Sequence, residues 1–230
     1  MFRAAVDWNP KQQKLREELS GKGNFDEAVK ICFSLHGIVH TSPVSSAKSH
    51  TYMDEIWDGL SREMFSEPLT QKNNLGRKAT IAWDIWHITR IEDITTNILI
   101  ANSNQVLNPT WLKRLGVKVK ETGNAMSDNE IARFSRSIDM EALREYRNDV
   151  GLRTREIINN LTPQDLKRKF KPESLKRIVD EGGVVEDEKS IWLIDFWGRK
   201  NVAGIILMPV TRHQLVHLNE CMRIKNKLSK

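Results

Sequence analysis

Apolar residues recur every three or four positions along four long segments of the chain, and a two-residue alternation is sustained nowhere. The first spacing places side chains on one face of an α-helix, whereas a half-buried strand needs the second. The segments cover about residues 24–42, 78–102, 139–161 and 209–228. Four amphipathic helices of this length predict an all-α fold, in which they share the core of a helix bundle.

The remaining segments predict how the chain is divided. Residues 162–204 contain short helical stretches separated by turn signals, so we expect a long connection with small accessory helices. Residues 1–22 are mostly polar, and we expect them to form an N-terminal extension. Residues 23–230 are then one helical-bundle domain, a size that suits a single core.

Composition limits the compartment and the partners. The net charge is +6, the hydrophobic content is 39%, and no run approaches the apolar length of a membrane span. The start of the chain lacks the apolar stretch of a secretory signal. Two cysteines, Cys32 and Cys221, are too few and too far apart for a disulfide framework. We therefore expect a cytoplasmic protein without a membrane partner.

The densest basic stretch is KRKFKPESLKR, residues 167–177. It matches no nucleic-acid-binding motif, and solvated short helices explain its charge. We therefore expect no nucleic-acid partner.

Three histidines interrupt the apolar faces of predicted helices. His213 and His217 stand four residues apart, so their imidazoles lie one turn apart on one face. His87 holds a corresponding position in the helix of residues 78–102. Three imidazoles in a bundle core can hold one divalent ion and leave a position for water or substrate. We expect zinc or nickel, and iron stays open. Gln214 follows the first histidine of the pair, where zinc proteases carry a glutamate base, which excludes that class.

His36 and His40 form a second pair of histidines four residues apart. Either could line the site, replace a ligand or act as a catalytic acid–base group, and both could instead be packed histidines with hydrogen-bond partners.

Four other residues are candidates for the pocket or for contacts with the ligands. Asp84 precedes His87 by one turn and could orient a ligand ring. Trp83 could wall the pocket, and Arg90 lies nearly one turn beyond His87. Cys221 could be a fourth, soft ligand or a small core residue.

Several segments together resemble the DinB-like superfamily. The main one is TIAWDIWHITRIEDITTN, residues 80–97, which resembles the second helix of that family. Further similar stretches are LHGIVH, DEIWDGL (54–60), EALREYRNDVGLRTREII (141–158) and IWLIDFWGRKNVAGIILMPVTRHQLVHLNE (191–220). The resemblance covers roughly residues 25–225.

The resemblance implies a four-helix bundle with a long crossover connection, often dimeric. It also implies one divalent metal held by a histidine of the second helix and an HxxxH pair of the last, which here are His87, His213 and His217. Characterised relatives include transferases that use low-molecular-weight thiols, and also isomerases and hydrolases.

We therefore expect a metal-dependent enzyme that activates a small thiol, or water, for transfer to an electrophile in detoxification or stress response, and that forms a homodimer. A metal-dependent hydrolase, with His36 or His40 as proton shuttle, is one alternative. A non-catalytic helical module with a structural metal is the other, and its site would be closed by a fourth protein ligand.

Overall fold

The computed structural model describes residues 2–20, 23–46, 49–69 and 76–229. Within these ranges the chain is helical and has no β-strand, only an isolated bridge between Lys169 and Asn201. The predicted all-α class is confirmed.

The four segments predicted as long helices contain α2 (Phe25–Val39), α6 (Ile81–Asp93), α9 (Met140–Asn159) and α13 (His213–Leu228). Each contributes buried residues to the main apolar cluster. Their starts follow from side-chain caps where these are present. Asn24, Thr80 and Asp139 each accept a hydrogen bond from a backbone N–H of the first turn of α2, α6 and α9.

Two of the predicted helices include a π-helical segment. The segment η2 (Ile94–Ile100) continues α6, and η4 (Met208–Arg212) leads directly into α13. Single π-helical turns inserted in a helix are often found at functional sites. Here η4 ends at the residue before His213.

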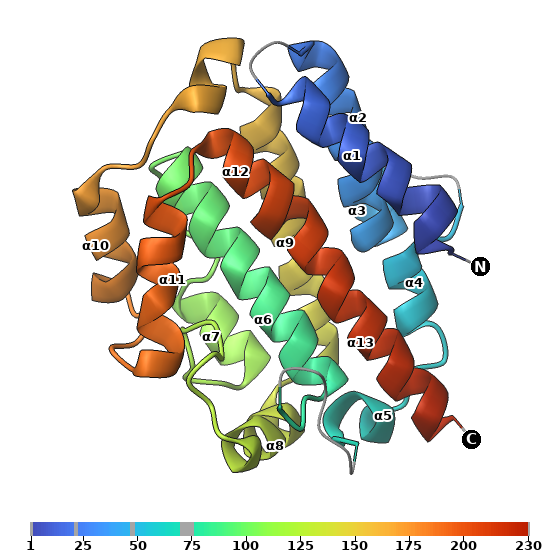
Figure 1. Cartoon of the computed structure of the whole chain (residues 1–230). Coiled ribbons are helices and arrows are strands. Elements are labelled where there is room, and N and C mark those ends of the chain that lie inside the picture. The colour runs from blue at the N-terminus through green and yellow to red at the C-terminus, as the bar shows by residue number, and fades with distance from the viewer. Residues whose placement is uncertain (1, 21–22, 47–48, 70–75, 230) are drawn as a thin grey trace.

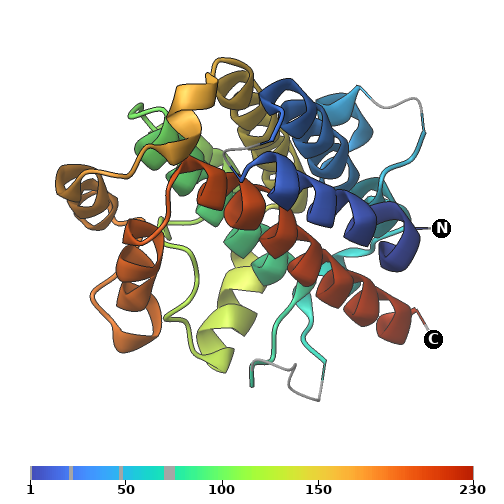
Figure 2. The same cartoon turned by 45° about the horizontal axis from the view of Figure 1, so that its top comes forward.

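Helix α6 occupies the centre of the molecule. It packs against α9 and α13, and Figures 1 and 2 show α13 lying alongside it in both views. Every residue of α6 is buried. A helix surrounded by protein has no solvent-facing side for its polar residues, so each buried polar group needs a partner. The polar residues of α6 therefore become the centres of three separate clusters, described below.

Shorter helices fill the connections. They are α3 (Ser42–Ser45), α4 (Tyr52–Trp57), α5 (Arg62–Ser66), α7 (Pro109–Leu115), α8 (Asp128–Ser137), η3 (Pro163–Lys167), α10 (Pro172–Asp180), α11 (Glu188–Gly198) and α12 (Val202–Leu207). Of these, α10 and α11 lie on the side of the molecule away from the two termini (Figure 1).

The residues before α2 form two helical segments. They form η1 (Ala4–Trp8) and α1 (Asn9–Glu18), and α1 packs along α2. Trp8, Leu15 and Leu19 are buried in the same apolar cluster as the long helices. These apolar residues are few and lie among charged residues, so the sequence of this segment does not show a clear apolar helix face.

Among the described residues, no helix combines the length and the apolar character needed to cross a bilayer.

Candidate metal centre

Helices α6 and α13 bring the three predicted histidines together. The ring centroids of His87 and His217 are 4.6 Å apart, those of His213 and His217 4.7 Å, and those of His87 and His213 5.1 Å. One ring nitrogen of each lies within 4.8 Å of the other two. Bonds of about 2.1 Å from one ion to three imidazoles place those nitrogens roughly 3.4 Å apart in tetrahedral geometry, so small side-chain adjustments suffice. The rings are inclined to one another by 55–62° and can therefore converge on a common point.

The hydrogen bond of His87 fixes its tautomer. Its Nδ1 lies 2.7 Å from the backbone carbonyl oxygen of Thr122. Because a carbonyl oxygen can only accept, Nδ1 carries the proton and donates it. The neutral ring is therefore left with a bare lone pair on Nε2, the form that binds a metal.

His217 has a carboxylate partner in the corresponding place. Its Nδ1 lies 2.6 Å from Oδ1 of Asp84, one turn before His87 on α6. A carboxylate at this position orients the ring and makes the opposite nitrogen a stronger ligand.

The third ring, His213, lacks such a partner. Its Nδ1 is buried, and no hydrogen bond to it forms within the described parts of the chain. A buried polar atom without a hydrogen-bond partner costs free energy. Of the three histidines, His213 is therefore the one whose side chain a bound metal ion would stabilise most.

The surroundings hold all three imidazoles in the neutral, ligating form. Burial lowers the pKa of His87 and of His213 well below the ordinary range, and the neighbouring His217 lowers both further. Burial also lowers the pKa of His217 to about 4. Three neutral imidazoles with a carboxylate behind one of them suit zinc, nickel or another imidazole-binding divalent ion.

A cavity of about 460 Å³ opens beside the three rings, which all line it. Trp83 lies parallel to His87, with ring centroids 4.8 Å apart and planes inclined by 10°, and forms part of the wall. The other lining residues come from α6, the approach to it, the loop after α7, α11 and η4–α13: Arg77, Ile91, Asn124, Lys189, Trp192, Leu193, Phe196, Trp197, Met208, Pro209 and Val216. This volume suits a small organic molecule.

The sequence did not point to two segments that complete the site. The first is the loop that carries Thr122 and Gly123. Gly123 has a φ of +85°, and a Cβ there would come within 2.5 Å of Nε1 of Trp83. The second is α11, which supplies five lining residues. A repeated pair of bulky residues in its sequence, Trp192–Leu193 and Phe196–Trp197, was the available signal, because side chains four apart share one helix face.

His36 and His40 belong to a different cluster. Their Nε2 atoms lie 2.9 and 3.0 Å from the two carboxylate oxygens of Glu92, on α6. Nε2 of Gln214 donates to the same carboxylate at 3.0 Å, and Arg147 donates to Oε1 of Gln214 at 2.9 Å. The predicted role of these histidines at the metal centre therefore lacks support, since neither lines the cavity.

Their donor atoms are close enough to hold a metal, but the geometry favours a hydrogen-bonded cluster. The two rings are stacked, with centroids 4.1 Å apart and planes inclined by only 25°, and each Nε2 faces a different oxygen of the Glu92 carboxylate. Although burial opposes its ionisation, His40 and His36 hold the pKa of Glu92 well below the ordinary range. Arg147 is near enough for its charge to be felt at Glu92, which disfavours another cation there.

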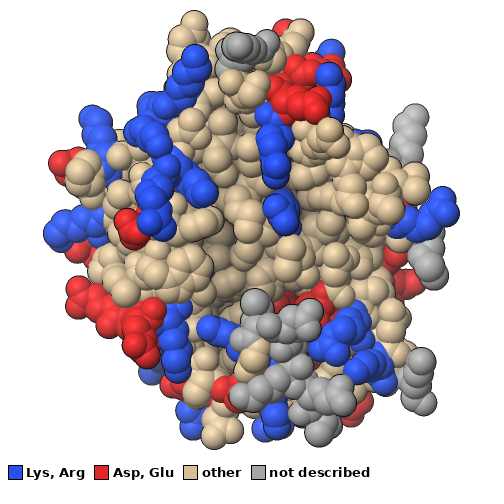
Figure 3. Space-filling model, in the orientation of Figure 1, with Lys and Arg blue, Asp and Glu red and all other residues tan. Residues whose placement is uncertain are grey.

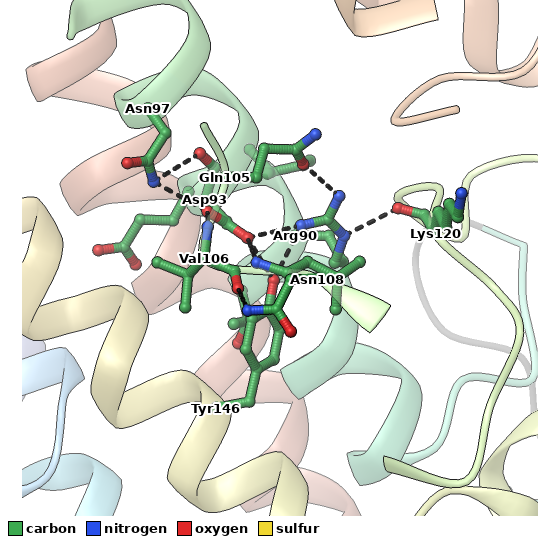
Figure 4. Close-up of polar contacts among 12 residues, drawn as sticks. Arg90, Asp93, Asn97, Gln105, Val106, Asn108, Lys120 and Tyr146 are labelled. Carbon is green, nitrogen blue, oxygen red and sulfur yellow. Dashed lines mark hydrogen bonds and ion pairs between the residues drawn. The ribbon is translucent and has the colours of Figure 1, made fainter. Parts of the chain in front are cut away.

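Arg90 and Cys221 also lie apart from the three histidines. Arg90 donates to Asp93, to the hydroxyl of Tyr146 and to the carbonyl of Lys120, forming the third polar cluster of α6 (Figure 4). It does not line the cavity. Cys221 is buried, and its sulfur does not join the three-histidine group. Of the four additional candidates, only Asp84 and Trp83 contact the ligand histidines.

Three of the six basic residues of the stretch 167–177, Arg168, Lys176 and Arg177, pair with acids. Lys176 contacts Asp180, and Arg177 contacts Glu181. Figure 3 shows acidic and basic side chains interspersed on the face it presents.

No protein-family model matches the chain, and no curated protein sequence matches it.

Proposed function

We propose that the chain is a DinB-like enzyme whose four-helix bundle holds one divalent ion at His87, His213 and His217. The observation that carries the proposal is the hydrogen bond from His87 to the carbonyl of Thr122, since it leaves a metal-binding lone pair beside two more neutral imidazoles. When bound, such an ion supplies the Lewis acidity that lowers the pKa of a thiol or of water.

The cavity supports a catalytic centre over a purely structural one. A structural zinc site is closed by four protein ligands. Cys221 and His36 are the candidates for a fourth protein ligand, but the sulfur of Cys221 lies outside the group and His36 is hydrogen-bonded to Glu92. The three histidines instead face a cavity large enough for a substrate.

The lining supports thiol transfer over hydrolysis. A hydrolase commonly places a general base within reach of the attacking water. Apart from the three histidines, no Asp, Glu or His side chain lines the cavity within the described ranges. A thiol needs less assistance, because coordination alone can deprotonate it. We therefore propose transfer of a low-molecular-weight thiol to an electrophile.

Metal analysis of the purified protein after metal-replete expression tests the centre. We expect one divalent ion per wild-type chain and none in the His87→Ala/His213→Ala variant. His36→Gln/His40→Gln is the matched control, because it removes the second histidine pair and should keep the ion. Retention of a full equivalent by the His87→Ala/His213→Ala variant would overturn the proposal.

A paired activity assay tests the reaction class. The metal-loaded protein is given a bimane electrophile with glutathione, bacillithiol or mycothiol, and separately a panel of esters and amides without thiol. Conjugation that requires the thiol supports the transferase. Cleavage that needs no thiol would instead support the hydrolase.

A further inference from the structure

The outer wall of the cavity is formed by one face of α11. Trp192, Leu193, Phe196 and Trp197 all line it. Trp192 is 49% exposed, and Val216 on α13, which lines the same cavity, is 52% exposed. Figure 3 shows the surface hollowed in this region, with walls of mostly uncharged residues. When a ligand covers large apolar side chains that are exposed around a cavity, the free energy falls, because apolar surface is removed from water.

The wall is suited to a flat ring. Trp192 and Phe196 are in edge-to-face contact, with centroids 5.9 Å apart and planes inclined by 72°. Such aromatic pairs attract a further ring in stacked or edge-to-face geometry. Trp83 presents another indole on α6. A flexible, strongly hydrated molecule would find few partners on these walls.

The charged groups of the cavity are all cationic. Arg77 and Lys189 line it, and no carboxylate side chain does so within the described ranges. The guanidinium of Arg77 is held by the carbonyl oxygens of Gly123 and Asn124, at 3.4 and 2.6 Å. Lys189 is exposed, and its charge is felt at Glu130, which lies outside the lining. The charges of Asp128 and Glu121, outside the lining, are felt at Arg77. Within the lining itself, Lys189 and Arg77 are the charged groups that would meet a ligand, and they favour an anion over a cation.

We propose that the substrate of this cavity is a flat aromatic molecule bearing an anionic substituent such as a carboxylate. Its ring packs on Trp192 and Phe196, its anion faces Lys189 and Arg77, and its reactive end points toward His87, His213 and His217. This inference rests on the proposed function, for which it names the class of electrophile. The electrophile is a different molecule from the thiol, and these walls do not explain how the thiol is recognised.

Calorimetric titration of the metal-loaded protein tests this substrate class with three probes that share one ring system. They are 2-naphthoate, neutral 2-naphthol and the cation 2-naphthylmethylammonium. We expect 2-naphthoate to bind most tightly, by about tenfold over the cation, a difference of roughly 1.4 kcal/mol. Equal affinity for the three probes, or preference for the cation, would overturn the inference.

Two variants test separately how the ring and the charge of the probe contribute to its affinity. Trp192→Ala should weaken all three probes by about three- to tenfold, because the indole contact is lost. Lys189→Gln should weaken 2-naphthoate alone, by at least about threefold, and leave 2-naphthol unchanged. The matched controls are Leu152→Ala and Lys176→Gln, an exposed leucine and an exposed lysine away from the cavity, which should bind like the wild type. Wild-type affinity of the Trp192→Ala or Lys189→Gln variant would contradict the assignment.

The metal content of the same samples distinguishes this inference from the proposed function. A protein that holds its ion but shows none of these preferences contradicts the substrate class alone. A protein that holds no ion contradicts the proposed function, whatever the titrations give.

Discussion

His217 and Asp84 lie on different helices, yet Nδ1 of the imidazole is only 2.6 Å from Oδ1 of the carboxyl group. Burial raises the pKa of Asp84 well above its ordinary range. A cation at the far side of the imidazole would favour the ionised carboxylate, and the carboxylate would in turn strengthen the imidazole as a ligand. The two groups therefore form a unit whose stability depends on the ion.

Asp84→Asn should weaken metal binding while leaving the three ligands in place. The amide can still accept the hydrogen bond from Nδ1, but it lacks the negative charge. We expect the dissociation constant to rise by about ten- to 100-fold, measured by competition with a chelating indicator. Asp195→Asn, which removes an exposed carboxylate on α11, is the control and should bind like the wild type. Unchanged affinity of Asp84→Asn would show that the contact does not tune the metal.

Tyr146→Phe should destabilise the fold without affecting the metal. The Tyr146 hydroxyl donates to Oδ2 of Asp93 at 2.6 Å and accepts from Arg90 at 2.8 Å, in a fully buried cluster. Loss of the hydroxyl leaves buried groups short of a partner, which costs about 1–3 kcal/mol of unfolding free energy. Urea denaturation measures this change.

Tyr52→Phe is the comparison for that measurement, because its hydroxyl donates a single bond, to Asn219 at 3.0 Å, that water can partly replace. The Tyr52→Phe variant should lose less unfolding free energy than Tyr146→Phe. A loss of bound metal in Tyr146→Phe would mean that the two clusters of α6 are coupled, contrary to this expectation.

The long helices and the three-histidine group could be predicted because both follow from helical periodicity. His87, His213 and His217 each take the place of an apolar residue in a repeating line, and a polar residue in such a line needs a buried partner. The same periodicity could not place Arg90. Helix α6 is buried on all sides, so its sequence does not reveal which neighbour each polar residue faces.

The groups that orient His87 and form the cavity wall could not be predicted, for a different reason. His87 is oriented by the backbone carbonyl of Thr122, and a backbone group leaves no mark in the sequence. The walls from α11 depend on how a distant short helix packs, which local spacing does not determine. The burial of Trp8 and Leu15 likewise depends on tertiary contacts of a mostly polar segment.

Gly151→Ala should lower stability although alanine is the better helix former. Gly151 lies inside α9, where the exchange would otherwise gain up to about 1 kcal/mol. A Cβ there would come within 2.5 Å of Nδ1 of His40 and 2.9 Å of a methyl group of Val44. Overpacking of this kind costs typically about 1–3 kcal/mol, which denaturant unfolding measures.

Gly198→Ala is the matched control for that prediction. Its Cβ would meet only the end of the Leu175 side chain, at 3.1 Å, which can move aside. We expect a stability close to that of the wild type. A stabilised Gly151→Ala variant would show that α2 and α9 can separate at His40 without cost.

His40→Gln should change how stability depends on pH. Burial lowers the pKa of His40 to about 3, whereas an imidazole in the unfolded chain titrates near 6.5. Between these values the unfolded state binds a proton that the folded state does not, so this group makes the protein less stable as the pH falls below 6.5. The variant lacks this contribution. The unfolding free energy that the variant lacks relative to the wild type at pH 7.5 should therefore shrink as the pH falls toward 4.5, by at most about 1.4 kcal/mol per pH unit. Urea unfolding at matched ionic strength measures this difference.

His50→Gln, at an exposed position, is the control and should give a curve of stability against pH that is parallel to the wild type. If the His40→Gln curve is parallel as well, His40 takes up a proton equally in the folded and unfolded states, and a neutral His40 in the cluster around Glu92 is wrong.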